Sequence, residues 1–337
     1  MRCALKWLAA LVAVLLVAFL LLRTPDTDPV AMRAKYGAAP SQFVELRPGL
    51  TVHYRDEGPR DAPVIVLLHG SNADLHTWDQ WTAALTDRYR VIRFDQIGHG
   101  LTGADPRGDY SPQNFAVDVG RIADRLGLKR FVLAGNSMGG GIALDYALRH
   151  PDRLAGLVLV DSAGAPQNGT GPSNIGFKIA ATPGLNRIMT IITPRWVVAQ
   201  SMEQAVARKE AASEIAIDRV WELLRYPGNR EATRLRITMP RTSFDPAKLA
   251  SLHVATLILW GDDDRMIPVE SGRWLAEAIP GSQLIVYPGV GHTPMEEAAA
   301  QSVADLRGWL AALPALAGDA GAKPLTPPRV DAARALP

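Results

Sequence analysis

A serine between glycines, in Gly135-Asn136-Ser137-Met138-Gly139, is the residue of this sequence best placed to act as a nucleophile. An apolar run precedes it and an amphipathic pattern, 138–149, follows it, so the serine is expected on a sharp turn from a strand into a helix. Glycines suit that turn because the neighbours of a strained serine must lack bulk. The helix start would also direct free N–H groups at a developing oxyanion. A serine at a helix start is more often an N-cap, but the strand and the glycines favour a nucleophile.

A serine hydroxyl is a weak nucleophile at neutral pH and needs a base within hydrogen-bond reach. Of the seven histidines, His292 follows the last apolar run and precedes a helical pattern. It would therefore lie at the carboxyl edge of a parallel sheet, beside the serine. A single histidine in a loop commonly has no catalytic role. Its place after Ser137 and after a group of aspartates favours the role of general base.

The third partner of such a site is a carboxylate that orients the imidazole and stabilises its charged form. Asp262, Asp263 and Asp264 all follow one apolar run. Periodicity does not choose among them, and adjacent aspartates also form solvated turns and helix caps. Asp95 and Asp161, which end two other apolar runs, are weaker candidates.

The elements that must position these residues follow an alternation of strands and helices. Continuous apolar runs suit strands that are buried on both faces, and the helical patterns between them indicate a mostly parallel sheet. An opening hairpin around Pro48-Gly49 comes first. The predicted strands then cover 64–70, 89–95, 129–135, 154–161, 254–261 and 282–289, and the predicted helices cover 78–86, 114–126, 138–149, 269–279 and 295–313.

One interval interrupts the alternation. About 90 residues separate the strands at 154–161 and 254–261, where a bare strand–helix–strand unit needs about 30. We expect residues 165–253 to form a helical cap over the carboxyl ends of the strands. The core would then comprise 43–164 and 254–313. The Ala-, Gly- and Pro-rich end, 314–337, is predicted to be a flexible tail.

The amino terminus is the most apolar segment. From Trp7 to Leu22 the sequence has no charge, glycine or proline. Sixteen residues of helix span about 24 Å, which approaches the roughly 30 Å of a hydrocarbon core. We expect residues 1–23 to be a transmembrane helix and 24–42 a linker, with the catalytic domain on the outer or periplasmic side. A cleaved signal peptide is the main alternative, although no small-residue cleavage site follows the run.

Composition excludes several other functions. The chain has 337 residues, is 47% hydrophobic and has a formal net charge of +2, without a run of basic residues. Nucleic acid is therefore not an expected partner. The single cysteine, Cys3, excludes internal disulfides and thiolate metal clusters. The histidines and aspartates of the loop 69–79 match no metal-binding spacing, so neither a metal nor a cofactor is expected. Nothing indicates an oligomeric state.

Residues 43–313 resemble the α/β-hydrolase superfamily. The matching motifs occur in order: His69-Gly70, the GNSMGG of 135–140, the WGDDDRMIP of 260–268 and the GHTPMEE of 291–297. The resemblance implies an eight-stranded sheet with helices on both faces. Its G-x-x-D-R pattern assigns the acid to Asp264, and its oxyanion hole would use the backbone N–H groups of Ser71 and Met138.

Two activities of this superfamily fit the motifs. Simple carboxylesterases and the hydrolases that cleave carbon–carbon bonds of ring-fission products share similar serine motifs. Ser71-Asn72-Ala73 and Gly291-His292-Thr293 depart from the carbon–carbon pattern, so the resemblance favours an ester as substrate, cleaved by water. The apolar cap suggests a hydrophobic substrate. A ligand-binding protein that keeps the fold without efficient catalysis is a further alternative.

Overall fold

Eight strands form one sheet in the computed structural model of the protein, which describes residues 2–166, 174–239 and 243–317. The strand order is β1-β2-β4-β3-β5-β6-β7-β8. The pairs β1–β2 and β2–β4 are antiparallel, and the remaining five pairs are parallel. The mostly parallel sheet is thus confirmed. Its strands are β1 (Ser41–Arg47), β2 (Leu50–Glu57), β3 (Val64–Leu68), β4 (Arg90–Phe94), β5 (Phe131–Asn136), β6 (Leu154–Val160), β7 (Thr256–Gly261) and β8 (Gln283–Tyr287).

Helices cover both faces of the sheet, because alternate residues of a strand point to opposite sides. On β3, Val66 and Leu68 pack with one set of helices, and Ile65 and Leu67 pack with the other set. Each fully buried aliphatic side chain stabilises the fold by about 1.5–3 kcal/mol. The first set is α4 (Pro112–Arg125), α5 (Met138–Arg149) and α12 (Val269–Ala278), and the second is α3 (Asp79–Leu85) and α14 (Ala299–Ala311).

Parallel pairing places the carboxyl ends of the central strands at one edge of the sheet. Leu68 of β3 pairs with Gly135 of β5, and Asn136 pairs with Val160 of β6. Gly261 of β7 in turn pairs with Tyr287 of β8. The residues directly after these strands therefore converge at that edge. They include Gly70, Ser71, Ser137, Asp161, Asp264 and His292.

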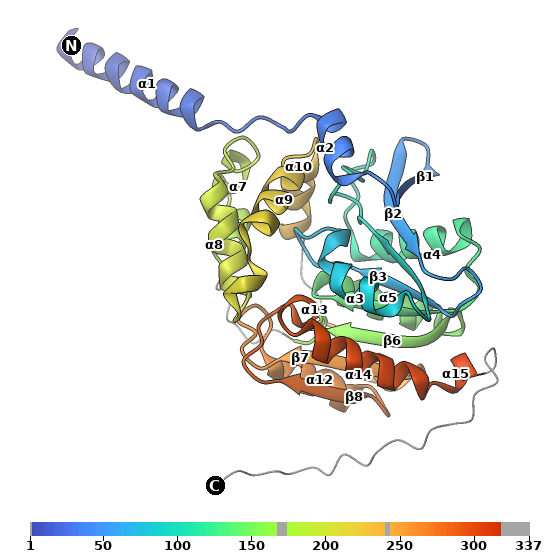
Figure 1. The fold of residues 1–337 in the computed structure, drawn as a ribbon. Helices are drawn as coiled ribbons and strands as arrows, with labels where there is room; N and C mark the ends of the chain where they lie inside the picture. The colour runs from blue at the N-terminus through green and yellow to red at the C-terminus, as the bar shows by residue number, and fades with distance from the viewer. Residues whose placement is uncertain (1, 167–173, 240–242, 318–337) are drawn as a thin grey trace.

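Helices also occupy the long interval between β6 and β7. Ser213 caps α9 by accepting a hydrogen bond from Ala216 N–H at 3.3 Å. Figure 1 shows α7, α8, α9 and α10 grouped together, away from α4 and α14. The division into a core and a cap at 165 and 253 remains a proposal. The helices of this interval are α6 (Ile175–Ala181), α7 (Leu185–Ile188), α8 (Arg195–Ala205), α9 (Glu214–Leu224), α10 (Asn229–Ile237) and α11 (Pro246–Ala250).

The amino-terminal helix α1 (Arg2–Leu22) projects away from the rest of the molecule (Figure 1). The sequence predicts a transmembrane helix at 1–23, but within the described residues no helix has both the length and the apolarity needed to cross a bilayer. At the other end, α14 is followed by α15 (Pro314–Ala317). The rest of the predicted tail, 318–337, lies outside the described residues.

The sequence predicts a linker at 24–42, between α1 and β1, and the structure places a helix in this segment. It contains α2 (Pro29–Tyr36), which forms because Asp28 caps Val30 N–H at 2.8 Å and Pro29 occupies the first turn. The residues before α2 bind helices of the 165–253 interval. Thr24 N–H donates to Ile191 O, and Thr27 N–H donates to Arg225 O, each at 2.9 Å. We call residues 24–36 the strap.

Candidate active site

Ser137 sits on the predicted sharp turn. It lies between β5 and α5 with φ +53° and ψ −118°, a conformation that non-glycine residues rarely adopt. The turn requires glycine on both sides. A Cβ on Gly135 would lie 2.2 Å from Gly139 O, and a Cβ on Gly139 would lie 2.3 Å from Leu68 O. The glycines of the motif are therefore fixed by the close approach of backbone segments.

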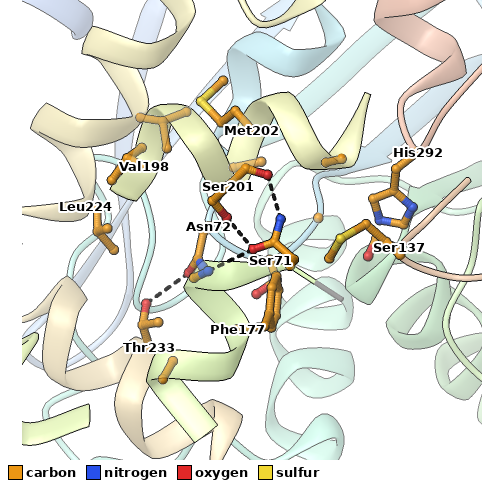
Figure 2. Close-up of a pocket in the computed structure, with 18 of the residues that line it drawn as sticks. Ser71, Asn72, Ser137, Phe177, Val198, Ser201, Met202, Leu224, Thr233 and His292 are labelled. Carbon is orange, nitrogen blue, oxygen red and sulfur yellow. Dashed lines mark hydrogen bonds between the residues drawn. The ribbon is translucent and has the colours of Figure 1, made fainter. Parts of the chain in front are cut away.

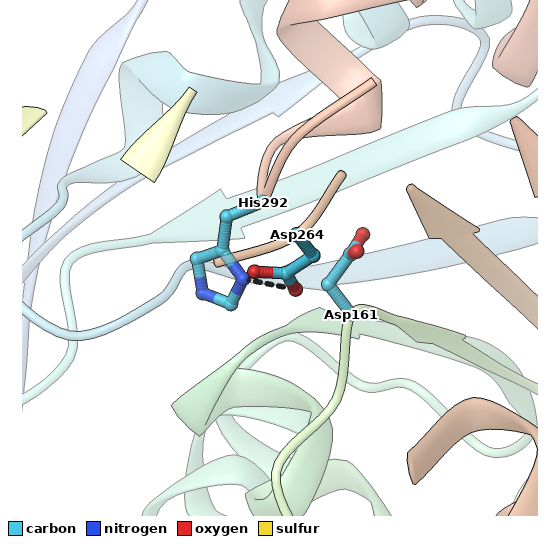
Figure 3. A group of neighbouring side chains, drawn as sticks. All are labelled: Asp161, Asp264 and His292. Atoms are coloured by element: carbon cyan, nitrogen blue, oxygen red, sulfur yellow. Dashed lines mark hydrogen bonds and ion pairs between the residues drawn. The ribbon is translucent and has the colours of Figure 1, made fainter. Parts of the chain in front are cut away.

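His292 and Asp264 form a buried pair. His292 Nδ1 lies 2.7 Å from Asp264 Oδ2, and the carboxyl side chain is fully buried (Figure 3). The other oxygen, Oδ1, accepts hydrogen bonds from Met266 N–H at 2.7 Å and Ile267 N–H at 3.0 Å. Asn136 Nδ2 donates to His292 O at 3.0 Å, which links the histidine loop to the residue before Ser137. Each oxygen of Asp264 is thus occupied, and one of them faces the imidazole.

The neighbouring aspartates point elsewhere. Asp262 accepts a hydrogen bond from Gly289 N–H at 2.7 Å, and Asp263 pairs with Arg265 at 2.9 Å near the surface. Asp95 lies 2.7 Å from His53 Nδ1, at a different part of the sheet edge. Of the candidates along the sequence, only Asp264 and Asp161 come near His292 in the described residues.

Ser137 and His292 line one cavity, and Figure 2 shows them next to each other at one side of it. The Ser137 hydroxyl forms no hydrogen bond to any residue that the structure describes. Catalytic hydrogen bonds are often loose without substrate and tighten when substrate binds. The arrangement is therefore compatible with proton transfer from Ser137 to His292 in a complex.

The residues expected to bind an oxyanion also meet at the turn. A Cβ on Gly70 would lie 3.2 Å from Ser137 Cβ, so the segment before Ser71 touches the serine directly. Ser71 lines the cavity, and Met138 is the first residue of α5. Both residues are thus close to the nucleophile. Their role in binding an oxyanion remains a proposal.

Sequence reasoning missed an arginine beside this turn. Arg236 of α10 donates to Ser71 Oγ, to Met138 Sδ at 3.3 Å and to Asn72 Oδ1 at 3.0 Å. Asn72 has φ +60° and also accepts from Thr233 Oγ1 at 3.1 Å (Figure 2). A helix of the 165–253 interval is therefore bonded to the two residues whose N–H groups flank the serine.

The cavity has a volume of about 200 Å³. Most of its wall is apolar and comes from helices of the 165–253 interval. A water-excluding apolar wall favours a substrate with a hydrophobic group. The apolar lining residues include Phe177, Met189, Val198, Met202, Leu224 and Met266.

One part of the wall is charged. Asp74 Oδ2 lies 3.1 Å from Arg219 Nε, and both line the cavity. Burial alone would raise the pKa of Asp74, but Arg219 and the hydrogen bonds from His76 lower it well below its usual range. Glu296 lines the same wall, where burial raises its pKa to about 7 against the opposing charge of Arg219. The charged wall thus contains one carboxyl that changes its protonation near neutral pH.

Asp161, Asp264 and His292 are residue types that bind metal ions, and their ligand atoms lie close together. One ligand atom of each lies within 4.8 Å of the others. Two ligands of one zinc ion, each about 2.0–2.1 Å from it, lie about 3 Å apart or more. His292 Nδ1 and Asp264 Oδ2, at 2.7 Å, are closer than this and have hydrogen-bond geometry. The cluster fits a hydrogen-bonded pair better than a metal site.

Comparison with known proteins assigns the family. A family model described as "Alpha/beta hydrolase family" matches residues 65–306. The chain belongs to the alpha/beta hydrolase family. A 2-hydroxy-6-oxononadienedioate/2-hydroxy-6-oxononatrienedioate hydrolase of Pseudomonas putida is 31% identical over 270 residues, which cover 76% of this chain and 91% of that protein. A bifunctional esterase/perhydrolase of Acinetobacter calcoaceticus is 30% identical and covers 74% of this chain and 92% of its own length.

Solved structures of this α/β hydrolase's relatives agree with the fold. A thermophilic esterase from Thermogutta terrifontis has a TM-score of 0.68 and 27% identity, and the match covers 80% of this chain and 98% of that one. The crystal structure of a membrane phospholipase A has a TM-score of 0.70 and 24% identity, and the match covers 92% of this chain and 98% of that one. The fold and the superfamily inferred from the motifs are therefore confirmed.

Proposed function

We propose that this α/β hydrolase cleaves carboxylic esters through an acyl-enzyme, with Ser137 as nucleophile, His292 as general base and Asp264 as the acid that orients the imidazole. The observation that carries the proposal is the 2.7 Å contact between His292 and a buried Asp264, at a histidine that lines the same cavity as Ser137. A nucleophile, a base and an orienting carboxylate in this order are sufficient for acyl transfer.

In the proposed reaction, Ser137 Oγ attacks the ester carbonyl and transfers its proton to His292 Nε2. Asp264 accepts a hydrogen bond from His292 Nδ1–H, which fixes the orientation of the ring, and its negative charge stabilises the imidazolium. The N–H groups of Ser71 and Met138 would donate to the oxyanion. His292 then gives its proton to the leaving alcohol, and a water molecule releases the acyl group by the same steps.

The apolar cavity wall supports a hydrophobic acyl or alcohol group. A volume of about 200 Å³ suits a chain of several carbons, rather than a large polar group. Hydrolysis of p-nitrophenyl esters of increasing chain length measures this preference directly. Turnover that is insensitive to chain length would contradict the role of the cavity.

Cleavage of a carbon–carbon bond in a ring-fission dienoate is the second candidate. The identity of 31% to a relative named for such a reaction favours it. Parallel assays of p-nitrophenyl esters and a 2-hydroxy-6-oxo-dienoate separate the two activities. A kcat/KM for the dienoate above that for every ester would overturn the ester proposal.

Labelling by a fluorophosphonate tests whether Ser137 is activated at all. We expect the wild type to be labelled and Ser137→Ala to remain folded and unlabelled. A folded wild-type protein that resists labelling would instead favour the third alternative, a ligand-binding member of the family that does not catalyse.

We further propose that α1 attaches the protein to a membrane, with the catalytic domain on the outer or periplasmic side. Its described apolar side chains are exposed, with 73% exposure for Trp7 and 64% for Val14. Exposed apolar surface of this extent is unfavourable in water and favourable in lipid. A membrane phospholipase A shares this fold. Fractionation of cells and protease treatment from the periplasmic side would test both parts.

A further inference from the structure

Asp161 is a buried carboxyl, directly after β6, that the proposed reaction does not use. Its Oδ1 accepts a hydrogen bond from Gly261 N–H of β7 at 3.0 Å. Its Oδ2 is buried and has no hydrogen-bond partner among the residues that the structure describes. An unpaired buried polar atom is costly, and native structures retain few of them. Asp161 therefore needs a reason to be an aspartate.

The backbone of Asp161 is also unfavourable. Its φ of +42° lies in the left-handed region, which side chains other than glycine rarely adopt. The conformation is held because Asp161 N–H donates to Leu259 O at 3.0 Å. It directs the carboxyl toward β7, the strand that Asp264 follows. Strain of this kind clusters at active sites.

Asp161 lies beside Asp264, which is drawn between Asp161 and His292 (Figure 3). One of its carboxyl oxygens, one oxygen of Asp264 and one ring nitrogen of His292 lie within 4.8 Å of one another. Asp264 is the partner in hydrogen-bond contact, at 2.7 Å. Asp161 is thus the second carboxyl near this imidazole among the described residues.

Three ionisable groups influence the charge of Asp161, namely Asp264, Glu297 and Tyr287. Burial raises the pKa of Asp161 well above its ordinary value, and the negative charges of Asp264 and Glu297 raise it further, against the hydrogen bond from Gly261. Tyr287 of β8 also faces it, and burial raises the pKa of that phenol. The surroundings of Asp161 therefore favour its protonated form.

We propose that Asp161 is a second positioning acid of this site, which replaces Asp264 beside His292 when the Asp264 carboxylate is removed. The proposal rests on the role of His292 as the base in the proposed function. It explains why a buried carboxyl is retained in a strained conformation with one oxygen unpaired.

The proton balance of the replacement is simple. In the wild type Asp161 keeps its proton, and Asp264 accepts the hydrogen bond from His292 Nδ1–H. In Asp264→Asn the neighbouring negative charge is absent, so Asp161 releases its proton to solvent at a lower pH than in the wild type, although burial still raises its pKa. Its carboxylate then accepts the hydrogen bond from Nδ1–H. No covalent bond other than this O–H changes.

A double-mutant cycle tests the proposal. We expect Asp264→Asn to reduce kcat/KM about 10²-fold, and Asp264→Asn/Asp161→Asn to reduce it by at least tenfold more. Asp161→Asn alone should reduce it about threefold. In Asp264→Asn the activity should gain an additional rise with pH, as Asp161 ionises, and the double variant should lose this rise. Equal activity and equal pH profiles of Asp264→Asn and the double variant would overturn the proposal.

Asp263→Asn is the matched control, because Asp263 belongs to the same loop and pairs with Arg265 near the surface. Combining it with Asp264→Asn should cause no further loss, and a tenfold loss would contradict a specific role of Asp161. Asparagine has nearly the shape of protonated aspartate and tolerates a left-handed conformation. Asp161→Asn is therefore expected to fold, which its thermal midpoint verifies.

An infrared measurement provides a readout that does not depend on turnover. Asp161 and Glu296 are the carboxyls of the described chain whose pKa is raised above its ordinary value. In a Glu296→Gln background, the stretch of a protonated carboxyl should be present at neutral pH and should vanish with Asp161→Asn, and in Asp264→Asn it should disappear at a lower pH than with Asp264 in place. A band that disappears at the same pH with and without Asp264→Asn would refute the proposal, even if no ester substrate were found. Absence of ester turnover in the wild type would refute the proposed function instead.

Discussion

Gly139, two residues after Ser137, shows how closely a single residue determines this site. A Cβ on Gly139 would approach Leu68 O to 2.3 Å, and Leu68 belongs to β3, which pairs with β5 inside the sheet. Gly308 of α14 is also helical, but a Cβ there meets nothing within 4 Å. The same substitution at these two positions should therefore have opposite effects.

We expect Gly139→Ala to lower the free energy of unfolding by roughly 2 kcal/mol or more through overpacking. Gly308→Ala should raise it by about 0.5–1 kcal/mol, because alanine favours a helix. Urea unfolding of both variants measures the difference. A Gly139→Ala protein as stable as the wild type would contradict the requirement for glycine at the turn.

A second prediction at this scale concerns Glu296. Its pKa in the folded protein is about 7, against an ordinary value of 4.5. The folded state therefore binds more protons than the unfolded state between these values, and stability falls as pH rises through that interval. Glu296→Gln removes this loss, so the variant should gain on the order of 1–3 kcal/mol over the wild type between about pH 4 and about pH 8.

Urea unfolding at both pH values gives the result for Glu296, with Glu277→Gln as the control. Glu277 is exposed on α12. Its substitution should leave the pH dependence of stability unchanged. If Glu296→Gln and the wild type lose the same stability over this range, Glu296 does not titrate near neutral pH.

At the scale of elements, Glu297 joins the histidine loop to the end of α8. Glu297 ends α13 (Pro294–Glu297). Its Oε2 accepts from Ala207 N–H at 2.8 Å, Arg208 N–H at 2.9 Å and Gly291 N–H at 3.0 Å. Its Oε1 accepts from Thr293 N–H at 3.1 Å. Both neighbours of His292 in the chain are thus bound to one buried carboxyl.

Glu297→Gln replaces an accepting oxygen with a donating amide, which leaves buried N–H groups unpaired. At about 1–3 kcal/mol for each unpaired group, we expect a loss of stability of about 2–4 kcal/mol. kcat should fall about tenfold or more while KM changes little, because the histidine loses its fixed position. Glu210→Gln, at an exposed residue near the same segment, should change neither quantity. A fall in stability without a fall in kcat would limit Glu297 to a structural role.

The part of this arrangement that sequence could predict is the local part. Ser137 and the alternation of strands and helices leave short patterns, because they depend on neighbours along the chain. Asp264 was assigned by resemblance, since Asp262 and Asp263 have the same local context. Their side chains differ only in which long-range partner each one reaches.

Contacts between residues that are far apart in the chain could not be predicted, because they produce no local pattern in the sequence. Arg236 and Ser71 are separated by 165 residues, so no local pattern joins them. Helix α10 contains three arginines, and its sequence therefore shows no clear apolar periodicity that would indicate a buried face. Glu297 precedes an ordinary helix, and nothing in GHTPMEE marks the second glutamate as the one that binds four N–H groups. The strap resembles a linker because many of its contacts are with residues about 165–205 positions away in the chain, such as Ile191, Glu222 and Arg230.

At the scale of the whole molecule, deletions should separate the effect of α1 on membrane attachment from the effect of the strap on stability. A variant without residues 2–22 should leave the membrane fraction and unfold at the same temperature as the wild type. A variant without residues 2–36 loses the hydrogen bond from Arg230 to Asp26, at 2.6 Å, and the contacts of Lys35 and Tyr36 with Glu222. It also loses the hydrogen bond from Thr24 N–H to Ile191 O. Residues 182–195, which include Ile191, should therefore be cut faster in limited proteolysis. Equal cutting of the two variants would contradict a stabilising role of the strap.

The attachment points of the strap have a mechanical consequence. Arg230, which lines the cavity, donates to Thr24 O at 2.8 Å, two residues after the end of α1. A displacement of α1 would therefore move the cavity wall at Arg230 before it moves the sheet. We expect binding of α1 to lipid to alter how fast substrate enters, with the catalytic residues themselves unmoved.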